Sequence, residues 1–423
     1  MKEIKHQGFS PYHKLVIFIL AITQFTVFLG FMIMAPMGDM LMKSIHLSPA
    51  QFGTIVSAYA FSAGISGLIT AAFADRFDRK KLLLFFYIGF ILGTFSCSLA
   101  SSYLTLVLAR VITGIFGGVI GSISLAIVTD LFGFEKRGRV MGLVQMGLGT
   151  SQVMGIPIGL YLGNTWGWQS AFLGIATLAC FIALLILWKL QPINAHLQLQ
   201  KANNSILKHL WRTFTNKQYI IAYAASALLM FGGYLFMPFS SVFAVNNLGV
   251  SEEQLPFLFM CSGISSLIVM PTVGRLSDKY DKLKILAIAI TWMIIMLIIY
   301  THLGPTPFVL VVITNILMMI GVLSRGTPSS ALISAVPEIE DRGAFMSMNS
   351  ALQQFAGGIA AWTAGLIIYQ PTPDSPIEHY PIIGYTTAVF NILSLLLMLQ
   401  INRYVKNRLK NTEGTILPSP NEL

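Results

Sequence analysis

Charge is scarce in this sequence: only 10% of its 423 residues are Asp, Glu, Lys or Arg, whereas 55% are hydrophobic. An average soluble domain is roughly 25% charged, so this chain lacks the polar groups that cover a globular surface in water. Its mean hydropathy of +0.72 points the same way. These values exclude an ordinary soluble protein and predict an all-α membrane protein.

Reactive and ligating residues are also scarce where they would carry chemistry. The three cysteines (Cys97, Cys180 and Cys261) are scattered in apolar stretches, where free cysteine is an ordinary packing residue. All seven histidines lie in loops or tails, and no phosphate-binding G-x-x-x-x-G-K-[ST] motif is present. We therefore expect no metal, no cofactor, no ATPase domain and no enzymatic activity.

Twelve apolar stretches are each long enough to cross a hydrocarbon core of about 30 Å. They cover 15–37, 51–72, 82–101, 103–127, 140–163, 169–189, 219–243, 255–274, 284–301, 307–332, 344–369 and 381–401. The first stretch lacks a small-residue cleavage site and is followed by eleven more apolar stretches. We therefore expect it to be a membrane span and not a cleaved signal peptide.

Lys and Arg are distributed unevenly over the loops. If the N-terminus is cytoplasmic and the spans alternate, all 27 fall on the cytoplasmic side except Lys43, Arg110 and Arg325. This positive-inside pattern predicts that both termini are cytoplasmic. The net charge of +10 therefore indicates topology and contact with anionic lipids, not nucleic acid. Short loops favour a bacterial inner-membrane protein.

Two charged loops recur at one spacing. Residues 71–81, with Asp75, correspond to 274–284, with Asp278, 203 positions later. The Glu-x-Arg-Gly run at Glu135 recurs at Glu340 after 205 positions. A duplicated unit of six spans explains both repeats. We expect a first bundle over 1–190, a linker over 191–217, a second bundle over 218–404 and a tail over 405–423.

The charged loop after span two resembles the signature loop of the major facilitator superfamily, and the likeness extends over the whole chain. It implies twelve helices in two pseudo-symmetric six-helix bundles that rock around a central site. Ala71 and Asp78 replace the usual glycines of the loop, and Asp281 replaces one in its repeat. Since Asp tolerates positive φ better than most residues, we expect the turn to be preserved.

In this family the aspartate of the loop closes the cytoplasmic side against the start of span eleven. The resemblance therefore assigns this closing role to Asp75 and, in the repeat, to Asp278. It also implies that loop cations pair with nearby acids, and the candidates are Arg76, Arg79, Lys80 and Lys282. The alternative is that these charges only anchor the topology.

Two arginines lie within spans, where a central Arg costs about 2.5–3.5 kcal/mol to insert. Arg110 starts a segment similar to the family's Arg-x-x-x-Gly-x-x-Gly pattern, which is associated with coupling or substrate binding; a structural pair is the alternative. The repeat offset places Asn315 at the matching position. Arg325, next to Gly326 and Pro328, is expected either to bind an anion or gate the inner side, or to snorkel to the interface.

Span five indicates a direction of transport. Its Gly155-Ile-Pro157-Ile-Gly159 segment resembles the span-five motif of drug:proton antiporters, with one residue inserted between the usual Gly and Pro. The glycines predict close helix contact and Pro157 predicts a kink. Packing alone is the alternative reading, but the motif favours export.

Proton antiport requires a titratable group on the pathway, and none of the 17 acids lies at mid-membrane. Asp39, at the outer mouth of span one, is the best candidate, with Arg110 as a neighbour that would lower its pKa. An anionic substrate bound to Arg110 is the rival arrangement. Six more polar or aromatic side chains within the spans are candidates for lining a cavity: Gln24, Tyr59, Gln145, Tyr234, Asn349 and Gln353.

The sequence thus predicts a monomeric secondary transporter that exports a small organic solute by alternating access in exchange for protons. A proton-independent uniporter or a nutrient importer of the same fold stays open as the alternative.

Overall fold

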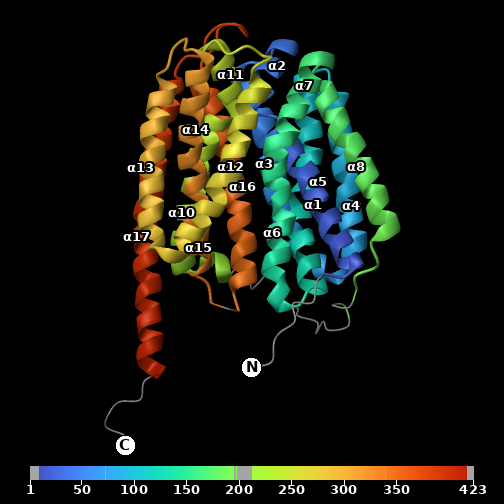
Figure 1. The fold of residues 1–423 in the computed structure, drawn as a ribbon, viewed down its shortest axis with the longest axis vertical. Coiled ribbons are helices and arrows are strands. Elements are labelled where there is room, and N and C mark those ends of the chain that lie inside the picture. The colour runs from blue at the N-terminus through green and yellow to red at the C-terminus, as the bar shows by residue number, and fades with distance from the viewer. Residues whose placement is uncertain (1–8, 72, 195–196, 198–211, 339, 417–423) are drawn as a thin grey trace, which may run out of the picture.

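A computed structural model of the chain describes residues 9–71, 73–194, 197, 212–338 and 340–416. Apart from one isolated bridge between Tyr369 and Glu378, the regular structure of these residues is helical. Two helical bundles stand side by side, and the described part of the chain begins and ends at the same end of the molecule (Figure 1). The predicted fold class, twelve spans in two bundles, is confirmed.

The first bundle holds six crossings, two of which are divided. Its elements are α1 (Pro11–Met32) and α2 (Gly38–Ser44), α3 (Pro49–Ala71), α4 (Arg79–Ser98), α5 (Tyr103–Leu131), α6 (Phe134–Thr150) with a π-helix (Ser151–Gly155) and α7 (Ile156–Trp166), and α8 (Gln169–Lys189).

The second bundle also has six crossings, and its first and fourth are divided. Its elements are α10 (Lys217–Phe236) with a 3-10 turn (Met237–Phe239) and α11 (Ser240–Asn246), α12 (Leu255–Lys279), α13 (Lys282–Thr301), α14 (Phe308–Ser324) and α15 (Gly326–Ser334), α16 (Arg342–Ile367), and α17 (Tyr380–Ile416). Helix α17 continues past the predicted end of its span and extends below the bundle in Figure 1.

Ten of the crossings in the described ranges are helices that are long and apolar enough to span a membrane. The remaining two have identifiable reasons for falling short. The fifth crossing is divided by the π-helix into pieces of 17 and 11 residues. Helix α16 carries Asn349, Gln353 and Gln354 and is packed against α3 of the other bundle.

Spans one and seven break near the same end of the molecule, although the apolar pattern predicts one continuous helix for each. Span one is irregular at 33–37, which contains Pro36, and span seven has its 3-10 turn around Pro238. Proline has no N–H for the helical ladder. Each break leaves a short helix, α2 or α11, and the two short helices contact each other between the bundles.

The charged loop between α3 and α4 corrects one expectation. Asp78 has φ −56° and accepts from the N–H of Lys81, and Asp281 has φ −59° and accepts from Leu283 and Lys284. The prediction that Asp replaces a glycine of positive φ is therefore wrong. Both aspartates are N-caps that bind the free N–H groups of the next helix.

The proposed boundary between the bundles remains a prediction. Most of the expected linker, 191–217, lies outside the described residues, as does the end of the expected tail.

Candidate functional site

The interface between the bundles is tightly packed at the end that carries α2 and α11, here called the closed end. A side-chain Cβ added at Gly53 of α3 would lie 2.6 Å from the carbonyl oxygen of Ala361. One added at Gly365 of α16 would lie 2.6 Å from that of Pro49, and one at Gly263 of α12 would lie 2.8 Å from Gln152. Backbones of the two bundles are therefore in direct contact here.

The end at which the described part of the chain begins and ends, here called the open end, is different. Added side-chain carbons at Gly67 of α3, Gly142 of α6, Gly274 of α12 and Gly343 of α16 would meet no atom within 4 Å. The same helices that pack tightly at the closed end thus have free space beside them at the open end. An interface closed at one end and open at the other is one of the two states that alternating access requires.

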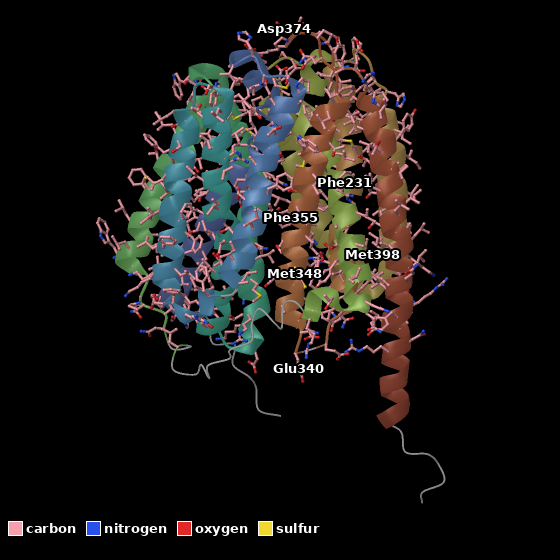
Figure 2. All side chains as sticks on the ribbon, turned by 180° about the vertical axis from the view of Figure 1, so that it is seen from behind. Phe231, Glu340, Met348, Phe355, Asp374 and Met398 are labelled. Carbon is pink, nitrogen blue, oxygen red and sulfur yellow. The ribbon has the colours of Figure 1, made fainter. Side chains whose placement is uncertain are left out.

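A polar cluster, here called the latch, joins the bundles at the closed end. Lys43 of α2 lies 2.9 Å from Asp39, 3.7 Å from Glu252 and 3.6 Å from Asp374. Asn246 of α11 donates to Asp39 across the interface. Glu252, Asp374 and Asn246 belong to the second bundle. Lys43 therefore links α2 to two loops of that bundle, and Asp39 links α2 to α11; Figure 2 shows Asp374 at this end.

The latch follows the internal repeat. Ser241 donates to the carbonyl of Ala35 at 2.6 Å, a pair 206 residues apart, and the Asn246–Asp39 pair is 207 residues apart. Both separations are close to the repeat spacing, so α2 and α11 meet at nearly equivalent positions. Asn164 adds a further link, since it donates to the carbonyl of Glu252 at 2.8 Å.

Asp39 is buried in this latch and lies outside the apolar helix of span one. Burial raises the pKa of Asp39. The hydrogen bond and charge of Lys43 and the hydrogen bond from Asn246 lower this pKa, but burial has the larger effect. The structure does not bring Asp39 to Arg110, as the sequence led us to expect: the ion pair of Asp39 is with Lys43.

Arg110 of α5 is fully buried inside the first bundle. Its Nη1 donates to the carbonyl oxygen of Gly30 at 2.8 Å, and its guanidinium lies 4.6 Å from the centre of the Tyr59 ring. Carbonyls in the last turn of a helix lack an internal donor, and a cation there interacts favourably with the helix dipole. Arg110 therefore caps α1 just before the break, while its Nε and Nη2 keep no protein partner.

A series of aromatic rings extends from Arg110 across the interface to the second bundle. Phe31 lies 4.9 Å from Tyr59, which covers Arg110, and 6.0 Å from Tyr234 of the second bundle. Tyr234 in turn packs on Gly357 of α16, where an added Cβ would lie 3.3 Å from its ring. Both tyrosines predicted to line a cavity therefore belong to one contact series between the bundles. Nearby, Phe355 of α16 meets Phe61 of α3 (Figure 2).

Asn315 forms the counterpart of Arg110 in the second bundle. Ser262 of α12 donates to its Oδ1 at 2.5 Å. Ser262 and Tyr59 are 203 positions apart, as Asn315 and Arg110 are 205 apart, so the repeat places two contacting pairs at equivalent positions. The first bundle has a cation under an aromatic ring where the second has a neutral hydrogen bond.

Arg325 lies at the junction of α14 and α15 and is buried. Its Nη1 donates to the carbonyl of Leu229 at 3.0 Å and to Oδ1 of Asn391. An added side chain at Gly233 would collide with its guanidinium, so this glycine makes room for it. Arg325 does not snorkel to an interface: it joins α10 and α17 inside its own bundle.

Span five packs its glycines against span one. Added carbons at Gly155, Gly159 and Gly163 would meet Leu29, Ile33 and Met40, respectively. Pro157 occupies the first turn of α7, directly after the π-helix. The predicted kink is thus a π-turn, in which the N–H of Ile156 donates to Ser151.

The three glutamines proposed from the sequence occupy different surroundings. Gln24 is buried between α1 and α5, and its Nε2 has no hydrogen-bond partner. Gln145 of α6 is exposed, and Gln353 of α16 is half-buried. Reasoning from the sequence missed Gln152, Asn246, Glu252 and Asp374.

The signature loop lies at the open end. Arg79 pairs with Asp130 at 3.0 Å and Lys80 donates to the carbonyl of Leu187 at 2.9 Å, both within the first bundle. Arg76 and Asp278 are exposed, and Lys282 is half-buried. The side chain of Asp75 lies outside the described part of the structure, so its closing role stays a prediction.

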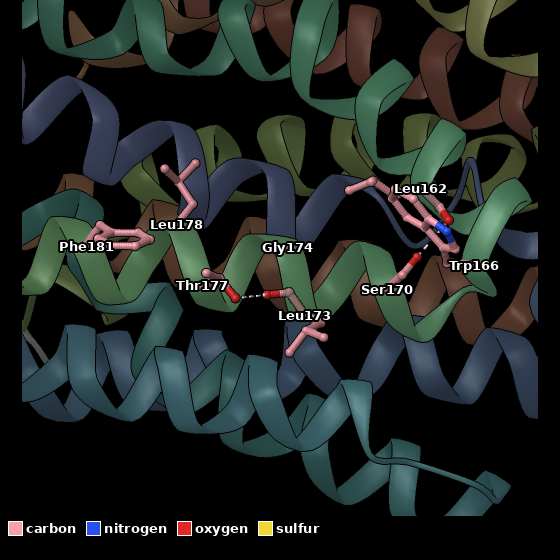
Figure 3. A pocket seen from close by; sticks show the side chains of 8 residues that line it. All are labelled: Leu162, Trp166, Ser170, Leu173, Gly174, Thr177, Leu178 and Phe181. Atoms are coloured by element: carbon pink, nitrogen blue, oxygen red, sulfur yellow. Dashed lines mark hydrogen bonds between the residues drawn. The ribbon is translucent and has the colours of Figure 1, made fainter.

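A groove lies on the outer surface, between α7 and α8 (Figure 3). Its volume is about 440 Å³ and its lining is mainly apolar, with Trp166 72% exposed. The hydroxyls of Ser170 and Thr177 are bonded to backbone carbonyls of Leu162 and Leu173. Because it is formed within one bundle and faces outward, this groove does not connect the two ends of the interface.

Comparison with known proteins identifies the family to which this chain belongs. The family model described as Major Facilitator Superfamily matches residues 20–246 and again 222–420, about one bundle each. The uncharacterized MFS-type transporter YbcL of Bacillus subtilis (strain 168) is 24% identical over 353 residues, which cover 83% of this chain and 88% of that protein.

Solved structures of other transporters share the fold. A bacterial homolog of the human lysosomal transporter Spinster, inward-facing and unoccupied, aligns over 95% of this chain and 99% of its own, with a TM-score of 0.74 and 15% identity. A D-xylose-proton symporter aligns over 92% and 97%, with a TM-score of 0.75 and 16% identity. The nucleoside transporter NupG aligns over 92% and 99%, with a TM-score of 0.72 and 15% identity. The chain is an integral membrane transporter that belongs to the Major Facilitator Superfamily.

Proposed function

We infer that this transporter exports a small organic solute by alternating access and exchanges it for protons. The observation that carries the proposal is the position of Asp39. It is a buried carboxylate of raised pKa, and it is bonded to both bundles at the closed end through Lys43 and Asn246. A group so placed couples its protonation to the separation of the bundles.

The sign of this coupling follows from the ion pair. A protonated Asp39 carries no charge, so the hydrogen bond that it accepts from Asn246 across the interface weakens, and the closed end opens more easily. As the end closes again, the carboxylate regains its partner and gives up the proton toward the open end. Because burial raises its pKa above 3.8, Asp39 takes up a proton at higher pH than a free aspartate.

The direction rests on topology and on span five. The Lys and Arg clusters gather at the open end, so this end faces the cytoplasm of a bacterial inner membrane. The Gly155-Ile-Pro157-Ile-Gly159 segment lies where the fifth crossing contacts both span one and the other bundle. In this account the bundles are 1–190 and 218–404, the protein acts as a monomer, and lipids are its other partners.

Inside-out vesicles with an acidic lumen provide the test. A panel of solutes is added while a quenching dye follows lumenal pH. We expect one or more solutes to release protons with the wild type and with Asp374→Asn, because Asp374 is an exposed partner of Lys43. We expect no release with Asp39→Asn, although labelled solute still exchanges across the membrane.

Other outcomes point elsewhere. Proton release that persists in Asp39→Asn would assign coupling to another group. Solute movement with no proton release in the wild type would favour the uniporter, a reading supported by the absence of carboxylates from the middle of the described spans.

A further inference from the structure

A small cavity lies between the bundles beside the latch, at the point where three crossings are irregular. It is lined by residues of the break in span one, of the π-helix in span five, and of the 3-10 turn and α11 in span seven, with α12 and α14 completing it. Its volume is about 60 Å³. In transporters, sites at the repeat interface are typically built where helices are discontinuous.

The lining of this inter-bundle cavity is apolar and adaptable. Met32, Met237 and Met319 contribute three thioethers from three different crossings, and none of the described residues that line it is charged. Methionine has several rotatable bonds and a polarisable sulfur, so it adapts to ligands of different shape. An anion or a cation would lose its hydration here without a partner of opposite charge.

Three side chains with hydrogen-bonding groups reach the cavity, and two of them are already engaged. Ser240 donates to the carbonyl of Met237 at 2.8 Å, and Ser262 donates to Asn315. The amide of Gln152 has only the sulfur of Met32 as a partner, at 3.8 Å. Sulfur is a weak acceptor, so Gln152 offers the cavity a free amide donor and a free amide acceptor.

The position of Gln152 is fixed by both bundles. Pro157 cannot donate to the carbonyl of Val153, and the chain forms the π-turn Ser151–Gly155 around that point. Gly263 of α12 allows the turn to approach, since an added Cβ would lie 2.8 Å from the Gln152 carbonyl carbon. Such π-turns often occur at functional sites.

We propose that the inter-bundle cavity is the substrate site in its contracted form, and that Gln152 orients the substrate. The substrate is then uncharged and largely apolar, with one amide, carbonyl or hydroxyl group that pairs with the amide of Gln152. Its apolar part lies among the three methionines. Sugars and organic anions are excluded because the cavity offers too few free hydrogen-bonding groups and no cation. This assignment rests on the proposed transport function but not on its direction or its coupling to protons.

Equilibrium binding to the purified protein in lipid nanodiscs, with no ion gradient, tests the proposal independently of export and antiport. The probes are radiolabelled benzanilide, benzoate and xylitol. We expect saturable binding of benzanilide and none of benzoate or xylitol. Gln152→Leu should weaken benzanilide binding about tenfold, the effect of one lost hydrogen bond to a buried group. Gln169→Leu, on the exposed first turn of α8 and away from the cavity, should not change it.

A variant that gains binding separates a specific loss of affinity in Gln152→Leu from misfolding. Gln152→Glu adds a carboxylate of similar size, so we expect it to acquire binding of benzylamine, a cation that the wild type rejects. Benzoate or xylitol bound more tightly than benzanilide by the wild type would overturn the proposal. So would equal benzanilide affinities for Gln152→Leu and Gln169→Leu, or a Gln152→Glu protein that binds benzanilide unchanged and benzylamine not at all.

Discussion

Gly53→Val should trap the protein with its closed end open. The added Cβ would lie 2.6 Å from the carbonyl oxygen of Ala361 and 3.2 Å from the Cα of Gly365, both backbone atoms of the other bundle. Backbone in a helix cannot move aside, so the bundles must separate. Overpacking of this kind costs about 1–3 kcal/mol, which shifts the balance between the two states by about tenfold to a hundredfold.

The measurement for this variant is the accessibility of Ser241, which is fully buried in the interface. In a background with Cys97, Cys180 and Cys261 replaced by serine, Ser241→Cys is reacted with a membrane-impermeant maleimide added from the closed-end side. We expect labelling to rise about tenfold or more with Gly53→Val. Gly304→Val is the matched control, since Gly304 lies in the loop before α14 and its added Cβ would meet no atom within 4 Å. Equal labelling of the two variants would contradict the prediction.

Lys43→Met should open the same end for an electrostatic reason. Lys43 is the only cation that the described contacts place among Asp39, Glu252 and Asp374. Without it, three carboxylates face one another and the buried one has no counter-charge. Leaving such a group unsatisfied costs about 1–3 kcal/mol, and the partial exposure of Lys43 favours the lower part of this range.

The Ser241→Cys assay reports this change as well. We expect Lys43→Met to increase labelling several-fold, more strongly at low salt than at high salt because screening weakens partly exposed ion pairs. Lys43→Arg keeps the charge and should label like the parent. Labelling of Lys43→Met that matches Lys43→Arg at every salt concentration would mean that the latch does not hold the bundles together.

The helices of this fold could be predicted from the sequence because each crossing is a long apolar run. Their breaks could not be located in the same way. Pro36 and Pro238 are visible in the sequence, but the ends of α1 and α10 are stabilised by distant donors: Arg110 binds the carbonyl of Gly30, and Tyr380 binds that of Phe236 at 2.9 Å. Periodicity contains no information on such tertiary partners.

The candidate site, too, could be predicted only in part. The insertion cost of a buried arginine singled out Arg110, and the internal repeat singled out Asn315. The latch was out of reach because its partners are more than 200 residues apart in sequence, although the isolation of Lys43 on the outer side was a visible signal. Gln152 was missed because helical spacing does not show that a π-turn directs it into the interface.

The central claim is that the closed end must open in every transport cycle. The most direct test joins Ala35→Cys to Ser241→Cys with a short, reducible bis-methanethiosulfonate linker, since Ser241 donates to the Ala35 carbonyl at 2.6 Å across the interface. Transport of the solute identified in vesicles is then measured before linking, after linking and after reduction. Our account predicts that transport is almost completely lost on linking and restored by reduction. Undiminished transport by a fully linked protein would contradict it.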